Sequence, residues 1–187
     1  MLAKALLLVD MSNDFIRLDG ALNCGQPGMD IIPYCRQLVE SFLESGDYVF
    51  DARDLHDMQD YEIASGMFPP HNLRETSGQE LVSELKEPLS QKEDQWVYIP
   101  KKHYNAGYGT SLFDLIREKG ITEIHVVGVC TDICVRYTVN GLHEFKTSEY
   151  PNLQIVVHRP GVASFNLDGH KESLAHFASA LGTSIVE

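Results

Sequence analysis

The feature that most constrains the fold of this chain is a regular alternation between strand-sized apolar runs and helix-sized segments. The first run, Ala3–Val9, is apolar over most of its length, as a strand that is buried on both faces should be. A helix is expected next, over residues 29–44, because apolar side chains recur there at helical spacing and Gly46 follows them. This order of elements is typical of parallel sheets that are covered by helices.

The same alternation continues to the end of the chain. We expect further strands at 48–52, 96–99, 123–129, 153–157 and 184–186, and further helices at 110–119, 132–145 and 169–181. The pattern predicts an α/β fold of three layers, in which a mostly parallel central sheet of about six strands carries helices on both faces. The chain has 187 residues, which suits a single domain over residues 1–187.

Charge, hydropathy and cysteine count exclude several classes of protein. The net charge is −12 and no basic stripe is present, so nucleic acid is not expected as a partner. No apolar run approaches the ~20 residues of a membrane span, and the first run ends at Asp10 without the features of a signal peptide. A cytoplasmic protein is therefore expected. Its four cysteines are too sparse for a disulfide scaffold, so a reactive thiol is compatible with the sequence.

A long segment with little periodicity, residues 53–95, separates the second and third expected strands. Only a short helix near residues 79–85 is expected within it. Loops of this length in compact domains are either functional or disordered. Because the segment is rich in Asp, His, Phe and Pro, we expect it to carry function.

Chemically active side chains follow the ends of four expected strands. They are Asp10 after the first, Asp54 and His56 after the second, Lys101 after the third, and Cys130 and Cys134 after the fourth. Ligands of open α/β sheets bind beyond the carboxyl ends of the strands. We therefore expect these side chains to converge on one site.

Cys134 is expected in the first turn of the helix that follows the fourth strand. Free backbone N–H groups and the positive end of the helix dipole would lower the pKa of its thiol and could bind an oxyanion. A small buried core cysteine is the alternative interpretation. A redox or metal pair with Cys130 is a third, although the spacing is C-x₃-C and not the C-x₂-C of such sites.

Asp10 and Lys101 could assist catalysis by the Cys134 thiol. A carboxylate at the end of an apolar strand is costly to bury without a partner, and Lys101 at the end of another strand supplies one. Together with Cys134 they make an acid/base carboxylate, a nucleophile and an orienting cation. Taken alone, Asp10 could also be a solvated strand end or a helix cap.

Asp54, His56 and His71 form a candidate metal site. Asp54 and His56 are two residues apart and point the same way in an extended segment, and two prolines precede His71. Such an Asp/His/His set suits a catalytic divalent ion. Glu62 lies between them and could add a carboxylate. Chance surface residues would produce the same short pattern.

The chain resembles the nicotinamidase branch of the isochorismatase-like cysteine hydrolases over nearly its whole length. Five blocks in the expected order carry the resemblance: Val9-Asp10 through Asp14-Phe15, Asp54-x-His56, Phe68-Pro69-Pro70-His71-Asn72 with Thr76-Ser77-Gly78, Lys101-Lys102-His103-Tyr104, and Gly128-Val129-Cys130-Thr131-Asp132-Ile133-Cys134-Val135. The family also includes hydrolases of isochorismate and of carbamoyl compounds, which remain the nearest alternatives.

The resemblance implies a catalytic triad of Asp10, Lys101 and Cys134, with Lys101 chosen over Lys102 because it begins the lysine block. It also implies a cis peptide bond before Cys130, and backbone N–H groups of Cys130 and Cys134 at an oxyanion. The implied reaction converts nicotinamide to nicotinate and ammonia through a thioester, in NAD salvage. Pyrazinamide would be a second substrate.

The resemblance assigns Asp54, His56 and His71 to one divalent metal ion, zinc first and iron(II) or manganese(II) as alternatives. A fourth ligand would come from the stretch before His71, where Glu62 is the nearest candidate. Three aromatic residues would wall the substrate ring, unless they are core: Phe15, Phe68 and Tyr104. Homo-oligomers are common in this family.

Two readings from other classes stay open at this point. A thiol redox protein would use Cys130 and Cys134, and a measured reduction potential would identify it. A non-catalytic metal-binding or scaffolding domain would bind metal without turnover.

Overall fold

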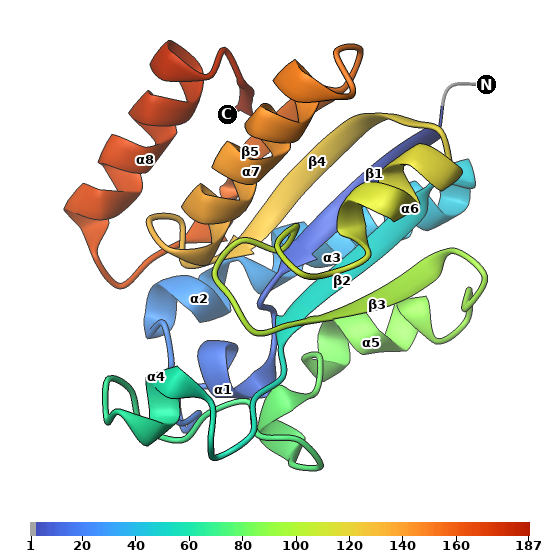
Figure 1. Cartoon of the computed structure of the whole chain (residues 1–187). Coiled ribbons are helices and arrows are strands. Elements are labelled where there is room, and N and C mark those ends of the chain that lie inside the picture. The colour runs from blue at the N-terminus through green and yellow to red at the C-terminus, as the bar shows by residue number, and fades with distance from the viewer. Residues whose placement is uncertain (1–2) are drawn as a thin grey trace.

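The computed structural model describes residues 3–187, which form one six-stranded sheet in the order β3-β2-β1-β4-β5-β6 (Figure 1). Every neighbouring pair of strands is parallel. The strands are β1 (Ala3–Val9), β2 (Tyr48–Asp54), β3 (Trp96–Lys101), β4 (Ile121–Val129), β5 (Gln154–Ala163) and β6 (Ser184–Val186). The predicted α/β fold with a central sheet of six strands is confirmed.

Helices cover both faces of the sheet (Figure 1). They are α1 (Asn13–Ile16), α2 (Gln26–Asp30), α3 (Ile32–Ser45), α4 (Tyr61–Ala64), α5 (Ser83–Leu89), α6 (Leu112–Glu118), α7 (Cys134–Ser148) and α8 (Leu167–Ala180), with a 3₁₀ helix η1 (Ser77–Gln79). Figure 1 shows α1, α2 and α4 near the carboxyl ends of β1 and β2, where the chemically active residues were expected.

Alternate side chains of β1 enter two separate cores. Leu7 and Val9 pack in the core that includes residues of α6, α7 and α8, whereas Leu6 and Leu8 pack in the core that includes α3 and α5. All four side chains are fully buried. The period of two along a strand explains why an unbroken apolar run was needed here: each face of the sheet has its own core to fill.

Several element boundaries differ from the prediction, and the largest difference in a strand is that β5 ends at Ala163 where an end at residue 157 was expected. The helix expected at 29–44 is two helices, α2 and α3, with Pro33 in the first turn of α3. The helix expected near 79–85 lies further along, as α5. β3 continues through Pro100, which lacks an N–H donor but is tolerated because β3 is an edge strand.

The strand order reverses direction between β1 and β4, and this junction is where ligands bind in open parallel sheets. Asp10 directly follows β1, and Cys130 directly follows β4. No helix within residues 3–187 combines the length and apolarity that crossing a membrane requires.

Candidate functional site

Asp10 is held rigidly at the end of β1. Its side chain is fully buried and its backbone has a positive φ of 55°. Its amide donates a hydrogen bond to the carbonyl of Ala52, and its Oδ1 accepts one from the amide of Asp54 at 2.9 Å. Backbone groups of β2 therefore fix this carboxylate and leave Oδ2 available to side chains.

Lys101, the last residue of β3, is buried between two carboxylates. Its Nζ lies 2.7 Å from Asp10 Oδ2 and 2.6 Å from Asp54 Oδ1. The contact with Asp54 is a hydrogen bond, whereas the contact with Asp10 is an ion pair without hydrogen-bond alignment. Burial opposes the charge on Lys101, yet Asp10 and Asp54 raise its pKa well above the usual value. The site therefore holds a permanent cation.

The two carboxylates respond differently to this cation. Burial, and the charge of Asp54, raise the pKa of Asp10 to about 6 against the opposing effect of Lys101. Burial also opposes ionisation of Asp54, but Lys101 and His56 lower its pKa below the usual value. Asp10 is thus the carboxylate that can gain and lose a proton near neutral pH.

Cys134 is the first residue of α7 and is 6% exposed. Its Sγ and one oxygen each of Asp10 and Asp54 all lie within 4.8 Å of one another. The expected lowering of its pKa is wrong. Burial raises the pKa of this thiol well above the usual value, Lys101 opposes that shift, and Asp10 adds to it. The thiol is therefore protonated at neutral pH, beside a carboxylate that can accept its proton.

The turn before Cys134 contains a cis peptide bond between Val129 and Cys130. Among the described residues, neither the amide of Cys130 nor that of Cys134 donates to a protein acceptor, so both remain available to a ligand. The sulfur of Cys130 lies 3.6 Å from that of Cys24. That contact pairs Cys130 with Cys24 instead of Cys134, which argues against the C-x₃-C redox pair.

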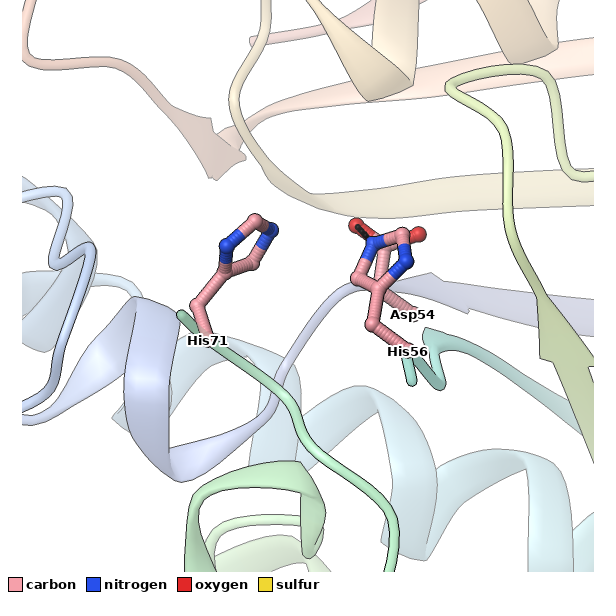
Figure 2. Close-up of side chains that lie close together, drawn as sticks. All are labelled: Asp54, His56 and His71. Atoms are coloured by element: carbon pink, nitrogen blue, oxygen red, sulfur yellow. Dashed lines mark ion pairs between the residues drawn. The ribbon is translucent and has the colours of Figure 1, made fainter. Parts of the chain in front are cut away.

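Asp54, His56 and His71 form a second cluster, in which one ligand atom from each residue lies within 4.8 Å of the others (Figure 2). Asp54 ends β2 and His56 follows it, while His71 faces them from a separate segment. All three side chains are buried. Among the described residues, Nε2 of His56 has no hydrogen-bond partner although it is buried. An orphaned imidazole nitrogen beside a carboxylate and a second imidazole fits a divalent metal ion.

The ring of His71 is oriented by the backbone. Its Nδ1 lies 2.8 Å from the carbonyl oxygen of Pro69, an acceptor, so Nδ1 carries the proton and Nε2 is free to bind metal. Glu62 does not belong to the cluster within 4.8 Å, although it lines the same pocket. Burial and the charge of Asp54 raise its pKa. A fourth ligand from Glu62 stays a prediction.

The two clusters open into one pocket. Its walls include all three aromatic residues that the sequence suggested: Phe15, Phe68 and Tyr104. The rings of Phe15 and Phe68 also pack against His71, with centroids 5.4 and 6.0 Å away. A flat ring placed among them would reach both clusters.

Four further residues line this pocket and were not assigned to it from the sequence: Leu22, Val129, Ile133 and Phe165. Phe165 follows β5 by two residues, but the strand was expected to end at residue 157, so the strand-end argument that selected Asp10 did not reach it. Leu22 lies in a loop without periodicity, and no sequence signal marks it.

The sequence of the chain is similar to a known family and to a protein of Bacillus subtilis. A model of the isochorismatase domain matches residues 4–186. The chain is 43% identical over 188 residues to an uncharacterized isochorismatase family protein of Bacillus subtilis (strain 168), with 98% of this chain and 99% of that protein covered.

Two solved structures are similar in fold. The crystal structure of a nicotinamidase/pyrazinamidase from Bacillus subtilis superposes with a TM-score of 0.90 and 38% identity, covering 99% of this chain and 100% of that one. The pyrazinamidase of Pyrococcus horikoshii in complex with zinc superposes with a TM-score of 0.83 and 26% identity, covering 98% of each chain.

Proposed function

This chain belongs to the isochorismatase family of hydrolases, and from that premise we propose that it is a nicotinamidase that also accepts pyrazinamide. One observation carries the proposal. The cluster around Cys134 and the cluster around His71 share Asp54 and open into the same aromatic pocket. A planar ring amide could therefore present its carboxamide to the thiol and its ring to the histidines.

The proposed nucleophile is Cys134 and the proposed base is Asp10. The thiol gives its proton to Asp10 as sulfur attacks the carboxamide carbon, and the amides of Cys130 and Cys134 donate hydrogen bonds to the oxyanion. Asp10 then returns the proton to the departing ammonia. A water molecule, deprotonated by Asp10, cleaves the thioester and releases nicotinate, and Asp10 returns that proton to the departing sulfur of Cys134. Lys101 keeps Asp10 oriented and balances its charge throughout.

We also propose that Asp54, His56 and His71 hold one divalent metal ion, with zinc the first candidate. The support is the orphaned Nε2 of His56 and a pyrazinamidase of similar fold in complex with zinc. Bound there, the ion would supply a Lewis acid that holds the ring nitrogen of the substrate and fixes the ring.

Ammonia release by the zinc-replete enzyme tests the function. We expect turnover of nicotinamide and pyrazinamide, and a kcat/KM for benzamide that is lower by about 100-fold, since benzamide lacks the ring nitrogen and small misplacements cost that much. Hydrolysis of isochorismate or a carbamoyl compound instead would identify another member of the superfamily. Bound zinc without any turnover would indicate a non-catalytic protein.

The role of the metal is tested by His71→Ala. If the ion orients the pyridine ring, this variant loses most nicotinamide turnover while benzamide turnover changes little. Equal kcat/KM for the two amides in metal-replete wild type would show that the ring nitrogen makes no productive contact.

A further inference from the structure

The ring of His56 is oriented by a carboxylate that the proposed mechanism does not use. Nδ1 of His56 lies 3.2 Å from Oδ2 of Asp60, the residue that precedes α4. A carboxylate ion can only accept a hydrogen bond, so the proton of the neutral imidazole sits on Nδ1. The opposite nitrogen, Nε2, faces Oδ2 of Asp54 at 3.7 Å, which is beyond hydrogen-bond range, and is the orphaned atom at the candidate metal site.

Asp60 is itself held from two further sides. Its Oδ2 accepts a hydrogen bond from the amide of Asp57 at 2.9 Å, and its Oδ1 accepts one from Nζ of Lys102 at 2.9 Å. Lys102 also reaches Oδ2 of Asp57 at 3.0 Å. With three donors around it, the Asp60 carboxylate has little freedom to turn away from His56.

The two histidines of the cluster are therefore oriented by different groups. His71 donates to a neutral backbone carbonyl, that of Pro69, whereas His56 donates to a charged carboxylate. A carboxylate partner makes an imidazole a stronger electron donor to a bound metal than a carbonyl does.

We propose that Asp60 and Lys102 are positioning residues for His56: Asp60 holds the proton on Nδ1 so that Nε2 binds the metal ion, and Lys102 holds Asp60 in place. The proposal rests on the proposed metal site, but the tautomer of His56 does not require a metal. The two adjacent lysines then act on different residues. Lys101 forms an ion pair with Asp10, and Lys102 forms one with Asp60.

The first test measures zinc affinity by competition with a chromophoric chelator. Asp60→Asn is expected to weaken zinc binding by about 10- to 100-fold, the usual effect of losing such a partner. The matched control is Asp57→Asn, which removes a carboxylate that also contacts Lys102 but keeps the backbone amide that binds Asp60. That variant should change zinc affinity by less than about 3-fold, because Asp57 does not touch His56. Equal losses in the two variants would overturn the proposal.

Lys102 is tested by substitution and rescue. Lys102→Met should weaken zinc binding by a smaller factor than Asp60→Asn, and Lys102→Arg should restore most of it, because a guanidinium can still donate to Asp60. Asn is as good as Asp before a helix, so circular dichroism of Asp60→Asn should match the wild type. An unchanged zinc affinity in Lys102→Met would remove Lys102 from the proposal.

The second test reads the tautomer directly. Long-range ¹H–¹⁵N spectra of the full chain, freed of metal by a chelator and recorded at a pH at which the His56 ring is neutral, should show His56 protonated at Nδ1 in the wild type and shifted toward the other tautomer in Asp60→Ala. The His56→Gln spectrum identifies the signal. A wild-type His56 protonated at Nε2 would refute the proposal. Because this measurement needs neither metal nor turnover, it separates failure of the positioning role from failure of the proposed function.

Discussion

Lys101 and Lys102 are adjacent at the end of β3, but their side chains lie in different environments. The side chain of Lys101 is fully buried against Asp10 and Asp54, while that of Lys102 is 44% exposed and pairs with Asp57 and Asp60. Successive side chains of a strand point to opposite faces, so one position separates a buried cation from a surface one.

The two cysteines of the β4–α7 turn should respond differently to removal of their sulfur atoms. Cys134→Ala is expected to lower kcat for nicotinamide by about 10⁴-fold or more, because the proposed nucleophile is lost. Cys130→Ala should keep activity within about tenfold of the wild type, because only its backbone N–H is proposed to act. Ammonia release and circular dichroism measure activity and fold in each variant. The reverse pattern would exchange the two assignments.

The raised pKa of Asp10 predicts the acid limb of the pH profile. Burial and the charge of Asp54 bring that pKa to about 6, and the proposed base acts only when ionised. The kcat/KM for nicotinamide should therefore reach half of its plateau near pH 6, level off toward neutrality, and approach a tenfold fall per pH unit below pH 6. The profile is measured in buffers of constant ionic strength. A limb near pH 4 would mean that Asp10 has an ordinary carboxyl pKa in the free enzyme.

At the scale of elements, the site depends on how closely β4 approaches β1. Gly128 has a φ of +125°, and a Cβ at this position would lie 2.0 Å from the carbonyl oxygen of Val9, the residue before Asp10. The absence of a side chain at one position therefore lets the strand that leads to the thiol pack beside the strand that leads to the base.

Gly128→Ala should destabilise the protein severely. The clash with backbone and the unfavourable φ together predict a loss of about 2–5 kcal/mol in the free energy of unfolding. The control is Gly66→Ala, which also has a positive φ, of 73°, but whose Cβ would meet no atom within 4 Å. Its loss should be about 1–2 kcal/mol. Urea unfolding measures both, and similar losses would mean that β1 and β4 can separate to accept the methyl group.

The strands could be located from sequence because each contains a local apolar run, although β5 continues to Ala163, beyond the expected end at residue 157. The division of the helix at Ile31 was missed because apolar periodicity continues across the break, although Pro33 marks it: a proline is favoured in the first turn of a helix and disfavoured inside one. Asp60 was missed because its proposed role depends on the fold, which brings it to His56 and Lys102. The pKa of Cys134 was mispredicted because a helix position reveals the dipole but not the burial, which is the larger effect.

At the scale of the whole molecule, acidic groups with opposite pKa shifts should give a stability maximum on the acid side of neutrality. Arg17 chiefly lowers the pKa of Glu84 to about 2, so this carboxylate stabilises the fold above pH 4.5 and loses that contribution as the pH falls toward 2. Asp10 has the opposite sign: its raised pKa means that stability is lost as the pH rises through about 6. The net charge of −12 at neutral pH adds self-repulsion above that point.

The melting temperature of the metal-free protein is therefore expected to be highest between about pH 4 and pH 5, where the Glu84 contribution is nearly complete and the Asp10 contribution is only partly lost. Glu84→Gln should lower it in that range by up to about 4 °C, since a partly exposed ion pair contributes at most about 1 kcal/mol. The difference from wild type should shrink as the pH falls toward 2, because protonation removes the same charge in the wild type. Glu93→Gln, at an exposed glutamate outside the salt bridges of the described chain, is the matched control and should leave the profile unchanged. Differential scanning calorimetry from pH 3 to pH 8 measures the curve, and a melting temperature that still rises between pH 5 and pH 6 would contradict the sign assigned to Asp10.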